Sequence, residues 1–335
     1  MAVTIKDVAK LAGVATSTVS RTLKDQPNIS EATKNKVRKA MAELGYVPNV
    51  AAQNLANRST QTIGLILPPN FHQNRIQHPF FMDVVSEISQ SLNQDQYTAS
   101  IVCDKDFESL FELVKQMHQQ RRVDGFIVLY SVENDPVTRY LLEEDIPFVM
   151  LGMPDIDDNQ IRYVDNDNVS VGRTATRFLL ERGHRRFAFV GRSQKELVYQ
   201  ERYNGYLLEM QRNNLDYQGF FNIDEAECLD ELIQYLETEN PTALFVGDDV
   251  LAIKLLPWLA QYGYRVGDNF SLMSVNNSVF STLFHPYLTT VDIHVKELSV
   301  QSAQLMVQLL KDQKLPLTKY IIPHEVIVRE TVMRI

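Results

Sequence analysis

The side chains best suited to direct recognition chemistry stand close together near the start of the chain. Thr16, Ser17 and Arg21 are spaced so that they share one face of a helix. A guanidinium donates two hydrogen bonds to guanine, and hydroxyls bond to base edges or phosphates. The plainer alternatives are a solvated charge for Arg21 and helix capping for the two hydroxyls. These three residues predict nucleic-acid recognition, provided that the neighbouring helices hold them where they can reach a DNA duplex.

The surrounding elements form the predicted helix-turn-helix. Residues 4–12 place apolar side chains at helical spacing, and Gly13 ends this helix. A second helix follows, with Val19 and Leu23 as its buried positions, and a third is expected over residues 30–44. In such a unit the second helix enters the major groove of DNA.

Charge and flanking hydroxyls support contact with a polyanion. Residues 1–60 carry nine Lys and Arg against four acids, although the whole chain has a net charge of −9. A basic head on an acidic body indicates that only the head touches DNA. Thr4, Ser20 and Ser30 suit phosphate contacts that fix register.

Signals for catalysis are absent from the sequence. It contains no P-loop, GxSxG or HExxH motif, and its seven histidines and two cysteines lack metal-ligand spacing. The acidic segment at 154–159 is interpreted as a solvated loop. We therefore expect no enzyme, cofactor or metal. The cysteine usage and the missing export signal predict a cytoplasmic protein.

From residue 62 the pattern predicts an α/β fold. Short apolar runs alternate with helical patterns, at 63–67, 99–103, 125–130, 148–152, 187–191, 243–246 and 270–275. Near-continuous apolar strands separated by helices are typical of parallel sheets covered on both faces. We expect two doubly wound lobes, with a ligand bound at the carboxyl ends of their strands.

Several segments together resemble the lactose-repressor (LacI/GalR) family. They cover nearly the whole chain: TIKDVAKLAGVATSTVSRTL at 4–23, KVRKAMAELGYVPNVAAQNLA at 36–56, VDN at 165–167, LLERGHRRFAFVG at 179–191, GDD at 247–249, HPYLTTV at 285–291 and IVRET at 327–331. Within the family, HPFFMDVV at 78–85, SVNNS at 274–278 and LTTVDI at 288–293 resemble maltose-type repressors of Gram-positive bacteria.

The resemblance implies a domain plan. An all-helical DNA-binding domain would cover 1–48, a hinge helix and linker 49–60, and an effector-binding core of periplasmic-binding-protein type 61–335. Lobe 1 of the core is expected at about 61–159 and 292–322, and lobe 2 at about 160–291 and 323–335.

The resemblance also assigns roles in the hinge and the dimer. Asn49 caps the hinge helix and joins the DNA contacts, and Leu55 enters the minor groove as an apolar wedge. The alternative for Leu55 is packing between hinge and core. Ile253 and Phe284 are expected at a homodimer interface. The segment 68–78 is a candidate lid or specificity loop.

The effector contacts implied by the resemblance come from both lobes. They are Phe80, Arg202, Phe221, Asp248 and Asn276. Arg202 is alternatively a surface ion pair, and each aromatic a core residue. Many relatives carry Asp where Asn276 stands, so the cleft loses a charge but keeps an amide that bonds hydroxyls. Asp249 is interpreted as a helix cap.

The function implied is a homodimeric repressor that leaves a palindromic operator when a saccharide, maltose or a maltodextrin, binds between the lobes. One alternative is a global catabolite regulator of the same family with a phosphorylated carrier protein as corepressor. Lys296 and Lys311 stand only at the ends of the helix such a partner would use. Alternatives from other classes are a sugar-binding transport protein and a sugar-metabolising enzyme.

Arg21→Ala should weaken specific operator binding by about 1–3 kcal/mol and relax the preference at one base position per half-site. Lys36→Ala is the control, because a phosphate contact affects all sequences alike. Binding to a series of single-base operator variants measures both. An unchanged preference pattern in Arg21→Ala would show that Arg21 reads no base.

Overall fold

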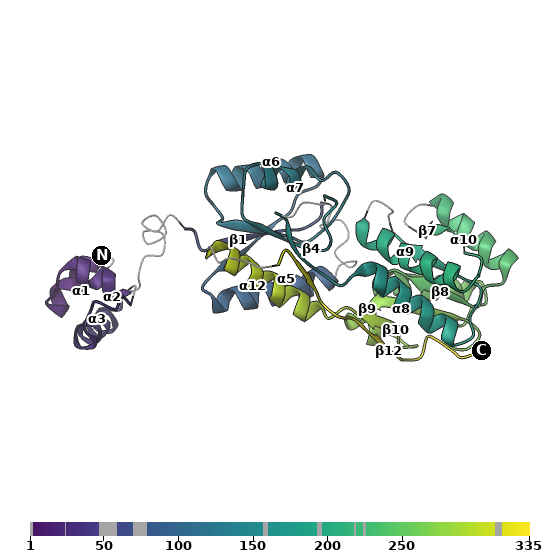
Figure 1. The fold of residues 1–335 in the computed structure, drawn as a ribbon. Coiled ribbons are helices and arrows are strands. Elements are labelled where there is room, and N and C mark those ends of the chain that lie inside the picture. Colours follow the sequence, from purple (N-terminus) through teal and green to yellow (C-terminus); the bar gives the residue numbers. More distant parts are fainter. Residues whose placement is uncertain are drawn as a thin grey trace. The chain divides into compact units, whose positions relative to one another are not determined.

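The computed structural model describes residues 3–23, 25–46, 59–69, 79–156, 160–192, 196–217, 219–223, 226–311 and 317–335. The chain divides into two compact units, residues 1–60 and 61–335, and each is described by itself (Figure 1). Asn49, Leu55 and the predicted hinge helix lie outside the described residues, as does segment 70–78 of the candidate lid.

The first unit contains three described helices: α1 (Ile5–Ala12), α2 (Thr16–Leu23) and α3 (Glu31–Leu44). Local chemistry sets their ends. The Thr4 amide donates to Asp7 Oδ2 at 2.9 Å before α1, and Ser30 Oγ accepts from the Thr33 amide at 3.3 Å before α3. Gly13, at φ 66°, leaves α1 in the left-handed conformation that glycine adopts without strain. The predicted helix-turn-helix is confirmed.

The second unit is built on two six-stranded sheets. The first has the order β11-β5-β4-β3-β1-β2 and the second β12-β10-β9-β8-β6-β7. All pairings are parallel except β10 with β12. The strands of the first sheet are β1 (Thr62–Ile66), β2 (Thr98–Val102), β3 (Gly125–Val128), β4 (Phe148–Leu151), β5 (Arg162–Asp165) and β11 (Lys319–Ile321). Those of the second are β6 (Phe187–Gly191), β7 (Phe220–Asn222), β8 (Ala243–Val246), β9 (Ser271–Asn276), β10 (Thr289–Asp292) and β12 (Glu325–Ile327).

Helices cover the sheets as the alternating pattern predicts. On the first sheet, α6 (Phe107–Gln119) and α7 (Pro136–Glu143) cover one face, and α5 (Pro79–Gln94) and α12 (Val295–Leu310) the other (Figure 1). Around the second sheet lie α8 (Asn168–Glu181), α9 (Leu197–Arg212), α10 (Ala226–Glu239), α11 (Asp249–Gln261) and the short 3-10 helix η2 (Val279–Thr282). The predicted fold class is confirmed. No helix in the described ranges is long and apolar enough to cross a membrane.

The chain crosses between the two sheets three times. It leaves the first sheet after β5 and returns after β10, and then leaves it again between β11 and β12. The lobe boundary predicted near residue 160 is therefore wrong for β5, which pairs with β4 in the first sheet. Its sequence, RYVD, lacks the apolar run by which the other central strands were identified.

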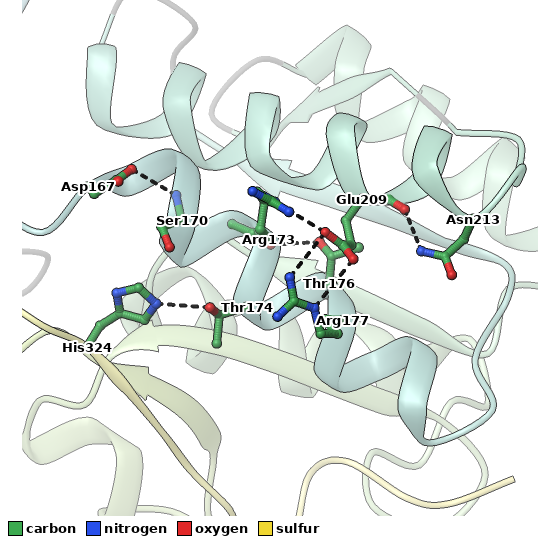
Figure 2. A network of polar contacts seen from close by, with 10 residues as sticks. Asp167, Ser170, Arg173, Thr174, Thr176, Arg177, Glu209, Asn213 and His324 are labelled. Atoms are coloured by element: carbon green, nitrogen blue, oxygen red, sulfur yellow. Dashed lines mark hydrogen bonds and ion pairs between the residues drawn. The ribbon is translucent and has the colours of Figure 1, made fainter.

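Helices α8 and α9 approach each other closely at two glycines. A Cβ on Gly172 would lie 2.0 Å from the Arg202 carbonyl oxygen, and one on Gly205 would lie 2.2 Å from that of Val169. Beside this contact, Arg173 and Arg177 of α8 both pair with Glu209 of α9 (Figure 2). The two helices are thus joined by backbone packing and by a shared carboxylate.

Gly172→Ala should lower the free energy of unfolding by about 1–3 kcal/mol, because the added methyl meets backbone that cannot rotate away. Chemical denaturation measures the change. Gly219→Ala is the matched control, since a Cβ at Gly219 meets no described atom within 4 Å. An unchanged denaturation midpoint for Gly172→Ala would mean that α8 and α9 separate without cost.

Candidate functional site

Helix α2 presents a polar face to solvent. Thr16, Ser17, Ser20 and Arg21 are all exposed, whereas Val19 is fully buried in the three-helix core. The sequence predicted this division, since Val19 was expected inside and the trio outside. A short helix anchored by its apolar face can thus bring hydroxyl and guanidinium groups to the edge of a duplex.

Two of the three hydroxyls predicted to contact phosphate, those of Thr4 and Ser30, already have local partners. Thr4 Oγ1 donates to Asp7 Oδ2 at 2.7 Å, and Ser30 Oγ lies 2.9 Å from Thr33 Oγ1. Two basic side chains are also occupied. The buried Lys34 ammonium pairs with Asp25 at 2.8 Å and with Glu31 at 3.1 Å, and Arg38 pairs with Asp25 at 3.1 Å. The exposed lysines and Arg21 therefore supply the positive surface of the described head.

The second unit contains a cavity of about 310 Å³ between its two sheets. The carboxyl ends of eight strands, or the residues just after them, contribute to it, namely those of β1, β3, β4, β5, β6, β8, β9 and β10. Ligands of open parallel sheets bind at such carboxyl ends. The volume lies at the small end of the range for ligand pockets. The cavity is therefore the candidate effector site.

Arg202 lies in this cavity and is almost fully buried, with 4% of its surface exposed. Its Nε donates to Asn168 Oδ1 at 2.9 Å and its Nη1 to the Gly247 carbonyl at 2.6 Å. The alternative interpretation of Arg202 as a surface ion pair is wrong. These two bonds fix the guanidinium plane at the cavity wall.

Asp248 begins α11 and carries several contacts at once. Its Oδ1 accepts from the Leu251 amide at 2.7 Å, which makes it the N-cap of the helix. Its Oδ2 accepts from Arg192 Nε at 3.2 Å and from the Tyr199 hydroxyl. The prediction that Asp249 is the cap is therefore wrong, and Asp248 orients Arg192 and Tyr199 at the cavity.

Asp249 is fully buried and also lines the cavity. Its Oδ2 accepts from the Ser278 amide at 2.7 Å, whereas its Oδ1 has no hydrogen-bond partner among the described residues. Burial raises the pKa of this carboxyl to about 6. A donor group on a ligand would satisfy the remaining oxygen.

Glu201 is a lining residue that was not identified from the sequence. Burial, with Asp165 and Asp167 nearby, raises the pKa of its carboxyl to about 7. Its position beside Arg202 in YQERYNGY was the available signal, but adjacency alone does not tell which neighbour faces a cavity.

The remaining predicted contacts divide into two groups. Phe80 and Asn276 line the cavity, and the Phe80 ring meets Phe81 edge-on at 5.2 Å. Phe221 does not line it, and its prediction as an effector contact is corrected. It lies buried in the edge strand β7, with its ring 5.5 Å from that of Tyr235.

The residues predicted at a dimer surface differ in exposure. Ile253 on α11 is half-buried against the core, whereas Phe284 is 49% exposed. Val279 and Leu283 beside it are more than half exposed. These three exposed apolar side chains, called the apolar patch below, lie within six residues of one another on and after η2.

Comparison with known proteins identifies both parts of the chain. A model of the lacI family of bacterial regulatory proteins matches residues 4–49, and one of periplasmic binding protein-like domains matches residues 176–332. The chain is 36% identical to the transcriptional regulator MalR of Streptococcus pneumoniae over 94% of each sequence. It is 32% identical to MalR of Staphylococcus xylosus over 98% of each.

A solved structure gives the same result. The transcriptional regulator CelR in complex with cellobiose superposes with a TM-score of 0.75 at 27% identity, covering 98% of this chain and 99% of that one.

Glu201→Gln should change how stability depends on pH. Because the folded pKa lies near 7 and the ordinary value is 4.5, the folded protein holds a proton that the unfolded chain has released between these values. The free energy of unfolding therefore falls as pH rises through this window. The variant lacks this contribution, so its melting temperature should rise relative to wild type between pH 4.5 and 8.

Melting curves recorded across this pH range measure the difference. Glu112→Gln, on the exposed side of α6, is the control and should follow wild type at every pH. Parallel curves for Glu201→Gln and wild type would contradict the assignment of the raised pKa.

Proposed function

Because the chain belongs to the lacI family of bacterial regulatory proteins, we propose that it is a homodimeric repressor released from a palindromic operator by a neutral saccharide. Maltose or a maltodextrin is the proposed effector. The observation that carries the proposal is the pairing of an exposed polar helix on a basic head with a cavity in the core whose wall combines apolar surface with carboxyl and guanidinium groups.

The DNA side of the proposal rests on α2. Thr16, Ser17 and Arg21 would contact bases, and Ser20 with Thr4 and Ser30 would contact phosphates. One head reaches one half-site, so a palindrome calls for two copies related by two-fold symmetry. The apolar patch at Val279, Leu283 and Phe284 is the proposed surface for that pairing, together with Ile253 on α11. Asn49 and Leu55 would complete the contacts in the hinge.

The sugar side rests on the composition of the cavity wall. Its described lining includes five carboxyl groups, Asp165, Glu196, Glu201, Asp248 and Asp249, against two guanidiniums, Arg192 and Arg202. Such a wall offers many oxygen acceptors to hydroxyl donors. Its two guanidiniums are already balanced by carboxylates, so it provides no excess positive charge for a phosphate or a carboxylate. Phe80 adds an apolar face of the kind on which a sugar ring packs. The relatives named MalR and the cellobiose complex of CelR support a neutral saccharide.

The rival with a carrier protein as corepressor has less support. Its basic residues are expected along α12, where Lys296 and Lys311 stand only at the two ends, and much of the helix is buried. A sugar-binding transport protein would explain the cavity but not the helix-turn-helix.

Anisotropy of a labelled operator, selected from random duplexes with the purified protein, tests the proposal. Maltose or maltotriose should release wild type, whereas a phosphorylated or uronate-containing disaccharide should not. Arg202→Ala should bind operator normally but need about a hundredfold more saccharide, because two charge-assisted hydrogen bonds to hydroxyls are lost. Arg202→Lys keeps the charge without the planar fork and should fall in between.

Arg212→Ala, an exposed arginine at the end of the same helix, is the control and should respond as wild type does. Release of Arg202→Ala at wild-type saccharide concentrations would show that the cavity site is wrong. Release by the anionic sugars alone would overturn the neutral-saccharide assignment.

A further inference from the structure

The three crossovers between the sheets meet at one side chain. Asn166 directly follows β5, Ile293 follows β10 and Ile322 follows β11. Each of these residues is therefore the first one beyond a strand, at the level where the chain passes from one lobe to the other. Asn166 is 3% exposed, so its amide is removed from bulk water.

The Asn166 amide bonds to both of the other crossovers. Its Nδ2 donates to the Ile293 carbonyl at 2.8 Å and to the Ile322 carbonyl at 3.2 Å, which uses both of its hydrogens. The Ile322 amide in turn donates to the Asp165 carbonyl at 2.8 Å. Carbonyls just beyond strand ends have no ladder partner, and this one amide supplies a donor to two of them.

The backbone turns sharply directly after this junction. Asp167 has φ 57° and His294 has φ 51°, and each is the N-cap of the next helix, α8 or α12. Hinges consist of a few such residues at element ends, where backbone angles can change while the packed elements stay intact. In two crossovers, a residue with positive φ thus comes directly after the residue that takes part in the Asn166 junction.

The junction is also connected to the candidate effector site. Asn168 Oδ1 accepts from Arg202 Nε at 2.9 Å, and Asn168 Nδ2 donates to Asp165 Oδ1 at 2.9 Å. A ligand that pulls on Arg202 therefore acts on α8 and on the last residue of β5. This is a continuous hydrogen-bonded route from the cavity to the crossovers.

We propose that Asn166 is a positioning residue that clasps the three crossovers into a single pivot, so that the lobes close on the effector as one concerted movement. The proposal rests on the proposed function for the effector. Without the clasp, each crossover would move independently, and the closed form would be less well defined. The saccharide then has to order the crossovers itself, which lowers its affinity.

The test uses Asn166→Ala and Asn166→Leu in the full-length protein; the leucine keeps the volume but not the donors. Without saccharide, both variants should show faster amide hydrogen exchange in peptides covering 289–295 and 319–325, with exchange elsewhere unchanged. Their affinity for maltose, measured by calorimetry, should fall by about tenfold or more, as expected for two lost neutral hydrogen bonds. Operator affinity without saccharide should stay at the wild-type level.

Asn213→Ala is the matched control. Its amide also donates to a backbone carbonyl, that of Glu209 at 2.8 Å, but within α9 of one lobe (Figure 2). It should leave both readouts unchanged. If maltose affinity falls in the Asn166 variants while exchange at the crossovers does not change, Asn166 is only a ligand contact and the proposal is wrong. Unchanged exchange and unchanged affinity would overturn it as well.

Failure of the proposed function gives a different result. If wild type binds no maltose, the effector assignment fails. Faster exchange confined to the crossovers would then still support the clasp, and uniform exchange would still refute it.

Discussion

The buried guanidinium of Arg202 is the interaction around which the wall of the cavity is arranged. A cation removed from water requires fixed acceptors, and here the Asn168 amide oxygen and the Gly247 carbonyl provide them. Those acceptors come from the start of α8 and from the residue after β8, so the guanidinium holds α9 in position against both. The close approach at Gly172 and Gly205 allows this position, because a side chain at either would push the helices apart.

The cavity wall around this cation contains several carboxyl groups that are unfavourably buried. Burial raises the pKa values of Asp165, Glu201 and Asp249, so each resists ionisation in a site without a ligand. Asp249 also keeps one oxygen without a described partner. A hydroxyl-rich molecule would supply the missing donors. The same carboxyl groups that are costly to bury would therefore contribute to the affinity for such a molecule.

Sequence reasoning succeeded where one strong pattern acted alone. The seven apolar runs are all strands, and the first and third helices of the head lie where their apolar spacing predicted them. The apolar pattern missed the other five strands, β5, β7, β10, β11 and β12. Each is three or four residues long, and its identity depends on pairing with neighbours rather than on its own pattern. The helix cap was assigned to Asp249 instead of Asp248 for a related reason. Both precede or open the same helix, and only the three-dimensional position of Ser278 decides which one caps it.

Lys34 has a consequence for how the head responds to salt. Its ammonium is held between Asp25 and Glu31, and Arg38 shares Asp25 at 3.1 Å, so these charges are partly neutralised before any duplex arrives. Binding to DNA releases condensed counterions in proportion to the phosphates that free cations neutralise. A head that commits part of its positive charge to its own fold displaces fewer of them. Its affinity for nonspecific DNA should therefore be lower than that of a head whose cations are all unpaired. A larger share of its binding free energy then comes from contacts with the bases.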